Sequence, residues 1–168
     1  AALNTARPFF SDPARRKALN WAIDRPALLR VAGKLAGTRT DQIIPPSVPG
    51  FRQARLYAIK GADPIMARKV APGIGGQIRL LHTTSPTSTA RAQVIQYNLR
   101  QIGVDVKLDP QPFGVAIKSA GTKGADFDMF LISWASDYPD PSVFINPLLD
   151  GRLIQDSNNS NYSYFDEE

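Results

Sequence analysis

The feature that most constrains the fold of this chain is the alternation of strand-like and helix-like segments along its second half. Three segments have the composition of strands, and each is followed by a helical pattern: residues 76–84, 104–110 and 127–134. The last of them begins FDMFLI and is apolar on both faces, which is typical of a central strand. Strands that alternate with helices in this way predict an α/β layer structure.

Helix starts are marked by aspartates that lie one or two residues before a proline, a combination typical of a capped first turn. Such starts predict helices at about 13–23 and 25–32, and a short one that follows Asp63. Apolar spacing predicts three more, over 85–103, 113–124 and 140–151. The last of these is expected to break near Pro147, because proline interrupts helical hydrogen bonding.

Two segments before the alternating half are predicted to be extended or irregular. Residues 1–5 are strand-like, and residues 38–53 are Pro-rich and aperiodic. The second segment carries four apolar side chains that would be costly to leave in water: Ile43, Ile44, Val48 and Phe51. We therefore expect it to be an ordered loop that packs against the surface.

The composition excludes several kinds of site. The chain has 168 residues, enough for one domain with a real core, and no cysteine, so disulfides and thiolate metal sites cannot form. His82 is the only histidine, which excludes a histidine-cluster metal site. The glycine-rich stretch GIGGQ at 73–77 precedes a strand, so it is expected to be a turn and not a phosphate loop. We therefore expect no metal and no cofactor.

The charge distribution predicts that the chain does not bind nucleic acid, and the hydropathy predicts no membrane-spanning segment. The net charge is +5, but the basic residues are scattered, without the clustering that nucleic-acid recognition requires. No apolar run approaches the roughly 18 residues needed to span a bilayer. No secretory signal is recognisable at the start of the chain. Both ends lack natural boundaries, so the chain is expected to be cut from something longer.

The segment 133–141, SWASDYPDP, is the candidate site, because ligands of open α/β sheets bind beyond the carboxyl ends of the strands. Trp134 and Tyr138 offer flat apolar area for stacking, and Asp137 between them can pair with an ammonium group. A structural interpretation fits the same residues: Trp134 in the core and Asp140 as a cap for the next helix. The pattern alone leaves both interpretations open.

Carboxylates around this segment suggest a second class, a carbohydrate-active hydrolase fragment, which would need two opposed carboxylates. Two of them lie at the start of the predicted strand and two lie beyond its end: Asp126, Asp128, Asp137 and Asp140. Catalysis is therefore not expected, and a hydrolase that uses Asp137 and Asp140 remains the alternative. A third interpretation is an interaction module, and full burial of Trp134 and Tyr138 in the core would favour it.

Taken together, four stretches resemble the peptide/nickel family, family 5, of extracellular solute-binding proteins of ABC transporters. In chain order they are LNTARPFFSDPARRKALNWAIDRPALL at 3–29, IIPPSVPGF at 43–51, ARAQVIQYNLRQIGVDVKL at 90–108 and FDMFLISWASDYPDPSVFI at 127–145. The last is the most specific of the four. The resemblance covers most of the chain.

The resemblance implies a lobe like those of type II periplasmic binding proteins, with a mixed sheet flanked by helices. Residues 1–168 would form a single lobe, the second of a two-lobed clamshell whose first lobe is absent from this chain. The implied function is capture of a peptide or related small solute by clamshell closure and its delivery to an ABC permease, without catalysis. The resemblance also implies a monomer outside the cytoplasm, in the periplasm or lipid-anchored at the cell surface.

The resemblance assigns roles to four residues. Asp137 matches the position that receives the α-ammonium group of bound peptides, and Trp134 and Tyr138 match residues that line the cleft. Some oligopeptide binders carry an arginine three residues before the tryptophan, where this chain has Leu131. His82 lies near the position where some dipeptide binders carry an arginine for the peptide carboxylate, so it is predicted to contact that carboxylate.

Overall fold

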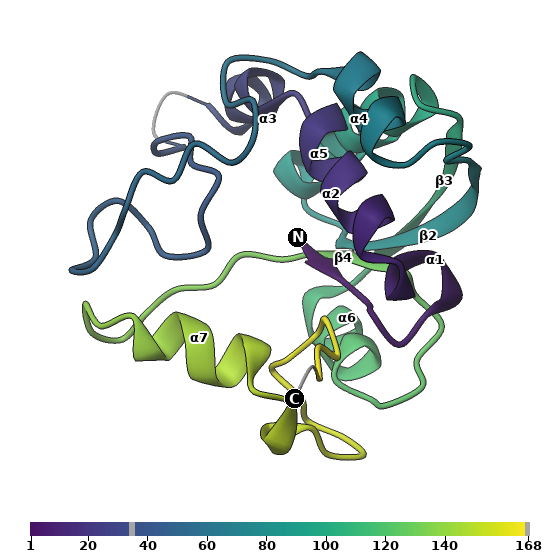
Figure 1. Ribbon diagram of the computed structural model, residues 1–168. Helices are drawn as coiled ribbons and strands as arrows, with labels where there is room; N and C mark the ends of the chain where they lie inside the picture. The colour runs from purple at the N-terminus through teal and green to yellow at the C-terminus, as the bar shows by residue number, and fades with distance from the viewer. Residues whose placement is uncertain (34–35, 167–168) are drawn as a thin grey trace.

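The computed structural model describes residues 1–33 and 36–166, and a four-stranded sheet lies at its centre (Figure 1). The strands follow the order β1-β4-β2-β3: β1 (Ala2–Leu3), β2 (Gly76–Thr83), β3 (Val104–Gln111) and β4 (Met129–Leu131). Strand β2 runs parallel to β3 and β4, whereas β1 is antiparallel to β4. The predicted mixed sheet is confirmed, and the segment predicted as central holds an interior strand, shorter than expected.

The described residues form seven α-helices and one 3-10 turn. They are α1 (Pro8–Ser11), α2 (Pro13–Ala22), α3 (Arg25–Ala32), α4 (Pro64–Val70), α5 (Pro86–Arg100), α6 (Phe113–Ala120), α7 (Ser142–Leu149) and η1 (Gly151–Leu153). Figure 1 shows α2, α4 and α5 on one side of the sheet and α6 on the other. The helices predicted from capping and spacing are confirmed, and α1 is an addition.

The boundary between α2 and α3 is held by hydrogen bonds from both directions. The Asp24 carboxylate accepts the backbone N–H of Ala27 at 3.0 Å and so caps α3. The backbone N–H of Asp24 donates to the side-chain oxygen of Asn98 on α5 at 2.9 Å. These two hydrogen bonds satisfy one backbone donor at the turn and one in the first turn of α3.

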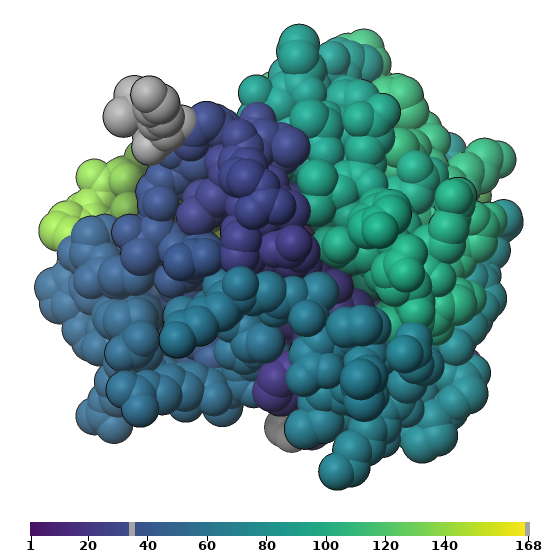
Figure 2. Space-filling model, turned by 90° about the horizontal axis from the view of Figure 1, so that it is seen from above, coloured from purple at the N-terminus to yellow at the C-terminus, as the bar shows by residue number. Residues whose placement is uncertain are grey.

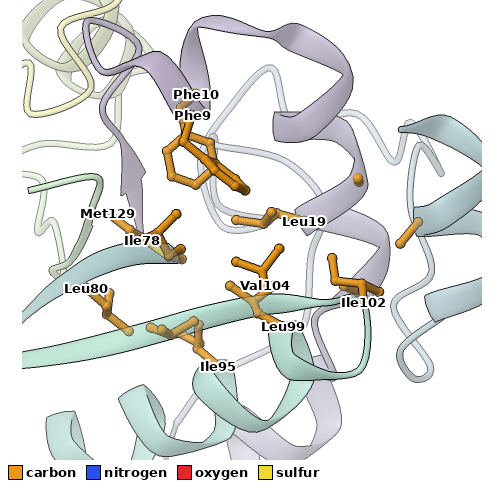
Figure 3. Close-up of a cluster of buried hydrophobic side chains, with 14 of the residues drawn as sticks. Phe9, Phe10, Leu19, Ile78, Leu80, Ile95, Leu99, Ile102, Val104 and Met129 are labelled. Atoms are coloured by element: carbon orange, nitrogen blue, oxygen red, sulfur yellow. The ribbon is translucent and has the colours of Figure 1, made fainter. Parts of the chain in front are cut away.

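The larger core lies between the sheet and the layer of α2, α4 and α5 (Figure 3). Phe10, Leu80 and Leu99 come from a helix, a strand and another helix, and each is 0% exposed. Phe10 also meets Phe9 edge to face, with ring centroids 4.9 Å apart. Figure 3 shows these two rings above Leu19, so α1 closes one end of the core.

A smaller core lies under the opposite face of the sheet. Phe127 and Phe130 project from the β4 segment toward α6, and they contact Tyr162 and Tyr164 of the C-terminal segment. The hydroxyl of Tyr164 donates to the carbonyl oxygen of Ala120 at 2.7 Å. The C-terminal segment is thereby fixed beneath the sheet.

The predicted break near Pro147 is wrong, since α7 continues through this residue to Leu149. Proline has no N–H, so the carbonyl group four residues earlier, that of Val143, lacks its helical donor. The indole Nε1–H of Trp134 donates to the Val143 oxygen at 2.9 Å. The helix therefore tolerates proline at this position because another side chain replaces the missing hydrogen bond.

Residues 36–62 form the predicted ordered loop, which extends the surface of α2 and α3 when the molecule is viewed from above (Figure 2). Val48 is buried as expected, but Ile43 is 44% exposed, and Ile44 and Phe51 are only half-buried. The loop is closed by Asp41, whose carboxylate accepts the backbone N–H groups of Leu56 and Tyr57.

The Asp41 carboxylate predicts that this loop is sensitive to acid. Burial raises the pKa of Asp41, but hydrogen bonds from Tyr57, Gln42 and Leu56 outweigh burial and hold the pKa below its ordinary value of 3.8. A depressed pKa means that the stabilisation is complete above the ordinary value and is lost as the pH falls through the folded value. We expect the amide proton resonances of Leu56 and Tyr57 to titrate with a midpoint below 3.8.

The control for this titration is Asp41→Asn, which keeps the shape of the side chain but cannot ionise. In this variant the two amide resonances should show no transition over the same acidic range. A midpoint above 3.8 in the unaltered protein, or the same transition in Asp41→Asn, would contradict the proposed role of the carboxylate.

Candidate functional site

The carboxyl ends of β2, β3 and β4 meet at one edge of the sheet because these strands are parallel in register. From this edge β2 leads into α5 and β3 leads into α6. The chain leaves β4 through residues 132–141, which run outward to α7 (Figure 1). The segment predicted as the site therefore lies at the edge where open α/β sheets bind ligands.

Three of the four predicted site residues are exposed on this segment. Tyr138 is 57% exposed and Trp134 is 37% exposed, although the indole N–H of Trp134 is bonded to Val143. Asp137 is exposed, and no other described residue forms a hydrogen bond or ion pair with its side chain. The full burial of both rings that would favour an interaction module is therefore not observed.

Asp140 has a different role from Asp137. Its carboxylate accepts the backbone N–H of Ser142 at 2.8 Å, and hydrogen bonding by Ser142 lowers the pKa of Asp140. It thus stabilises the first turn of α7. Of the two carboxylates in the segment, Asp137 alone is left available for a ligand.

The other two carboxylates near β4 are engaged at the opposite end of the strand. Asp126 forms ion pairs with Arg7 and Arg79, both at 2.8 Å. Asp128 accepts the backbone N–H of Arg79 at 2.8 Å and pairs with Arg7 at 3.4 Å. The carboxylates are divided between the two ends of the strand, and the structure offers no support for their use as an acid/base pair.

His82 is the one predicted site residue that the structure separates from the others. Its side chain is 1% exposed, and its Nδ1 lies 2.8 Å from the carbonyl oxygen of Thr83. Along β2 it points to the same side as Leu80, beneath α5, because side chains alternate along a strand. A ligand at the surface of this structure does not reach it.

A large hollow of about 570 Å³ adjoins Trp134, and we call it the Trp134 hollow. Its walls come from β1, the loop residues 40–45, the inner face of α7 and the C-terminal segment. Most of the lining is apolar, and Arg25 and Asp41 contribute charged groups at the loop side. Burial lowers the pKa of Arg25, while the charges of Asp41 and Tyr57 act in the opposite direction.

A smaller hollow of about 180 Å³ lies on the other side of the segment, and we call it the Arg91 hollow. It is lined by the ends of β2 and β4, the first turns of α5, and Phe113 at the start of α6. Ile132 borders both hollows, so the chain that leaves β4 forms the partition between them. This arrangement gives the edge of the sheet two recesses beside one exposed aromatic and acidic segment.

The hydrogen bond between Trp134 and Val143 yields a prediction about Pro147. In Pro147→Ala the new backbone N–H can bond to the Val143 carbonyl, so the indole N–H must share or lose its acceptor. We expect the Nε1–H resonance of Trp134 to move upfield and to exchange faster with solvent, while α7 persists. Proton NMR in a Trp21→Phe background would isolate this signal, because the chain has two tryptophans.

Pro72→Ala, in the turn after α4, serves as a matched control because it also replaces a proline and lies outside the lining of the Trp134 hollow. It should leave the Trp134 resonance unchanged. An unchanged indole resonance in Pro147→Ala would show that the proline has no part in holding the Trp134 ring.

The fold and this edge define an α/β ligand-binding unit of the kind found in bacterial solute-binding proteins. Residues 1–155 match the family described as bacterial extracellular solute-binding proteins, family 5 Middle. The chain therefore belongs to this family, which confirms the resemblance inferred from its motifs.

Curated relatives agree with this assignment. A probable di/tripeptide-binding protein 5 of Pseudomonas aeruginosa is 29% identical over 154 residues, covering 87% of this chain and 28% of that protein. The glutathione-binding protein GsiB of Shigella flexneri is also 29% identical over 154 residues, covering 87% of this chain and 30% of that protein. The chain thus spans under a third of the length of these relatives.

Solved structures show the same fold. A dipeptide-binding protein from Pseudoalteromonas sp. SM9913, in complex with Met-Leu, is 27% identical with a TM-score of 0.82, covering 99% of this chain and 33% of that one. The clavulanic acid biosynthesis oligopeptide binding protein 2 is 21% identical with a TM-score of 0.88, covering 99% and 32%. The expected lobe like those of periplasmic binding proteins is therefore confirmed.

Within residues 1–33 and 36–166, no helix is both long and apolar enough to cross a membrane. No group of three or more histidine, aspartate or glutamate side chains there is arranged to hold a metal ion.

Sequence reasoning missed Arg91 and the link between Trp134 and α7. Arg91 lies one turn inside α5, and its sequence neighbours give no sign that it faces the end of β4. The link did leave a signal, because the spacing of four residues between Val143 and Pro147 marks a helical carbonyl that needs an outside donor.

Proposed function

We propose that this chain is the ligand-binding lobe of a substrate-binding protein of an ABC transporter, with peptides or a related small solute as ligand. The observation that carries the proposal is the segment that leaves β4, which presents Trp134, Asp137 and Tyr138 to solvent at the binding edge of the sheet. The peptide- and glutathione-binding names of its relatives support this class of ligand.

The chemistry of the segment fits a peptide with a free amino terminus. An exposed carboxylate without a protein partner can accept hydrogen bonds from an ammonium group, and such charge-assisted bonds are stronger than neutral ones. The two aromatic rings offer apolar faces for the adjacent peptide backbone or side chain. Ligand binding is thus assigned to Trp134, Asp137 and Tyr138, and His82 is left out because it is buried.

The proposed protein is larger than this chain. Residues 1–168 would be the second lobe of a two-lobed clamshell, and the first lobe would supply the opposite wall of the cleft. Closure of the two lobes would sequester the solute and present the closed form to a membrane permease. We place the protein outside the cytoplasm, in the periplasm or anchored at the cell surface, as a monomer without catalytic activity.

Isothermal titration calorimetry of the full-length protein tests this function. The panel would hold di- and tripeptides, glutathione, their N-acetylated forms and an uncharged disaccharide. We expect micromolar or tighter binding of at least one peptide and at least tenfold weaker binding of its acetylated form. Binding of the disaccharide alone, or no binding of any peptide, would contradict the proposal.

A further inference from the structure

The positive charge of the chain is concentrated in one segment, α3 and the loop that leads to α4. Residues 25–63 contain seven Lys or Arg residues and two Asp residues, so their net charge of +5 equals that of the whole chain. The rest of the chain has thirteen basic and thirteen acidic side chains and is neutral overall. The two aspartates, Asp41 and Asp63, accept backbone N–H groups of the loop and of α4.

Most of the basic side chains of this segment are exposed. Five of them form a surface that we call the basic face: Arg30, Arg39, Arg52, Arg55 and Lys60. Within residues 1–33 and 36–166, Arg30 alone among them has an ion-pair partner, Asp24, and the closest atoms of that pair are 4.0 Å apart. Exposed cations without acidic partners produce a positive potential that attracts anionic surfaces.

Hydrogen bonds hold the parts of the basic face next to one another, although its residues are widely spaced in the sequence. The Asp41 carboxylate accepts the backbone N–H groups of Leu56 and Tyr57, which joins the two halves of the loop. The guanidinium of Arg25 on α3 donates to the carbonyl oxygen of Ala58 at 3.2 Å, which fixes the end of the loop beside α3. Figure 2 shows α3 and the loop as one continuous part of the surface.

The same segment also exposes apolar side chains. Val31 is 38% exposed, Ile43 is 44% exposed and Leu56 is 56% exposed. The cations of the basic face line neither the Trp134 hollow nor the Arg91 hollow. The basic face is therefore a broad surface of cations and apolar side chains outside both recesses, which suits an extended anionic partner better than a small molecule.

We propose that the basic face binds the anionic headgroups of a phospholipid bilayer. Each Lys or Arg near such a surface adds electrostatic attraction, and the exposed apolar side chains can enter the headgroup layer. Headgroups move within the bilayer and can therefore meet cations that no partner holds in place, whereas a protein would need fixed carboxylates opposite them. The contact goes beyond ligand binding, and it would keep the proposed receptor near the membrane that holds its permease.

Sedimentation with lipid vesicles tests this inference. The full-length polypeptide is used without any attached lipid, because an acyl chain binds vesicles by itself. Vesicles of phosphatidylcholine alone are compared with vesicles that hold equal amounts of phosphatidylcholine and phosphatidylglycerol. The test variant combines Arg52→Gln with Arg55→Gln. The matched control combines Lys118→Gln with Lys123→Gln, since these lysines are also exposed but lie outside the segment. Thermal unfolding checks that each variant is folded.

We expect the unaltered protein to bind only the vesicles with phosphatidylglycerol, and at least tenfold more weakly in about 1 M salt than in about 0.1 M salt. The arginine variant should bind about 10- to 30-fold more weakly, and the lysine control should change binding less than about threefold. Equal binding to both kinds of vesicle, equal losses in the two variants, or binding only to membranes that contain the permease would overturn the inference.

Peptide titrations of the same proteins keep this inference separate from the proposed function. Vesicle binding without peptide binding would contradict only the proposed function. Peptide binding without vesicle binding would contradict only this inference.

Discussion

Replacing Phe10 by alanine is expected to lower the free energy of unfolding by about 3–5 kcal/mol. Phe10 is 0% exposed and lies in the larger core, where α1 closes the space between α2 and the sheet. The substitution removes buried apolar surface and leaves a cavity that the surrounding side chains fill only in part. A domain of this size has a total stability of about 5–15 kcal/mol, so the loss would be a large part of it.

Chemical denaturation monitored by circular dichroism would measure this loss. Tyr97→Ala is the control, because Tyr97 is also aromatic but is 66% exposed on α5, and its removal should cost less than about 0.5 kcal/mol. If Phe10→Ala were as stable as Tyr97→Ala, α1 would not be part of the core, and the packing shown in Figure 3 would be incorrect.

Replacing Asp137 by asparagine is expected to weaken peptide binding by the full-length protein about 10- to 100-fold. This range corresponds to about 1.5–3 kcal/mol, the usual contribution of a hydrogen bond to a charged group. The substitution keeps the size of the side chain and removes the charge that would face the ligand ammonium. Because the exposed Asp137 side chain has no partner among the described residues, stability should change little.

Titration calorimetry with a peptide and its N-acetylated form would separate this contact from a general disturbance of the site. The loss in Asp137→Asn should be seen for the free peptide and be nearly absent for the acetylated one. Asp156→Asn is the matched control, since it removes the same charge from another exposed position. Equal losses for both peptides would remove Asp137 from the ammonium site.

The first prediction concerns the hydrophobic core, and the second concerns the ligand site. The core around Phe10 holds the sheet and the helices of one face in register, and this register brings the ends of β2 and β4 together. The site depends on that edge, because the segment that carries Asp137 leaves β4 where β4 is paired with the end of β2. Loss of the core should therefore abolish binding, whereas loss of Asp137 should leave the fold intact.

Much of the fold was predictable because short-range sequence patterns specify its helices and strands. The helix starts at Asp12, Asp24 and Asp63 were recognisable, since an aspartate cap acts on the backbone of the next two or three residues. The alternation that predicts β3 likewise reflects a single strand with one covered face. Errors arose where distant residues intervene, as at Pro147, where the donor that preserves α7 is thirteen residues away in Trp134.

Some features of the candidate site were likewise predictable from the sequence, and others depended on the tertiary structure. The sequence by itself determined the family and predicted Trp134, Asp137 and Tyr138 as ligand contacts, because one continuous segment carries all three after a recognisable strand. Only the tertiary structure decided that Asp140 caps a helix, that His82 is buried and that Arg91 faces a recess. The physical reason is that burial and pairing are properties of neighbours in space, and the parallel sheet pairs residues as far apart in the chain as Leu80 and Met129.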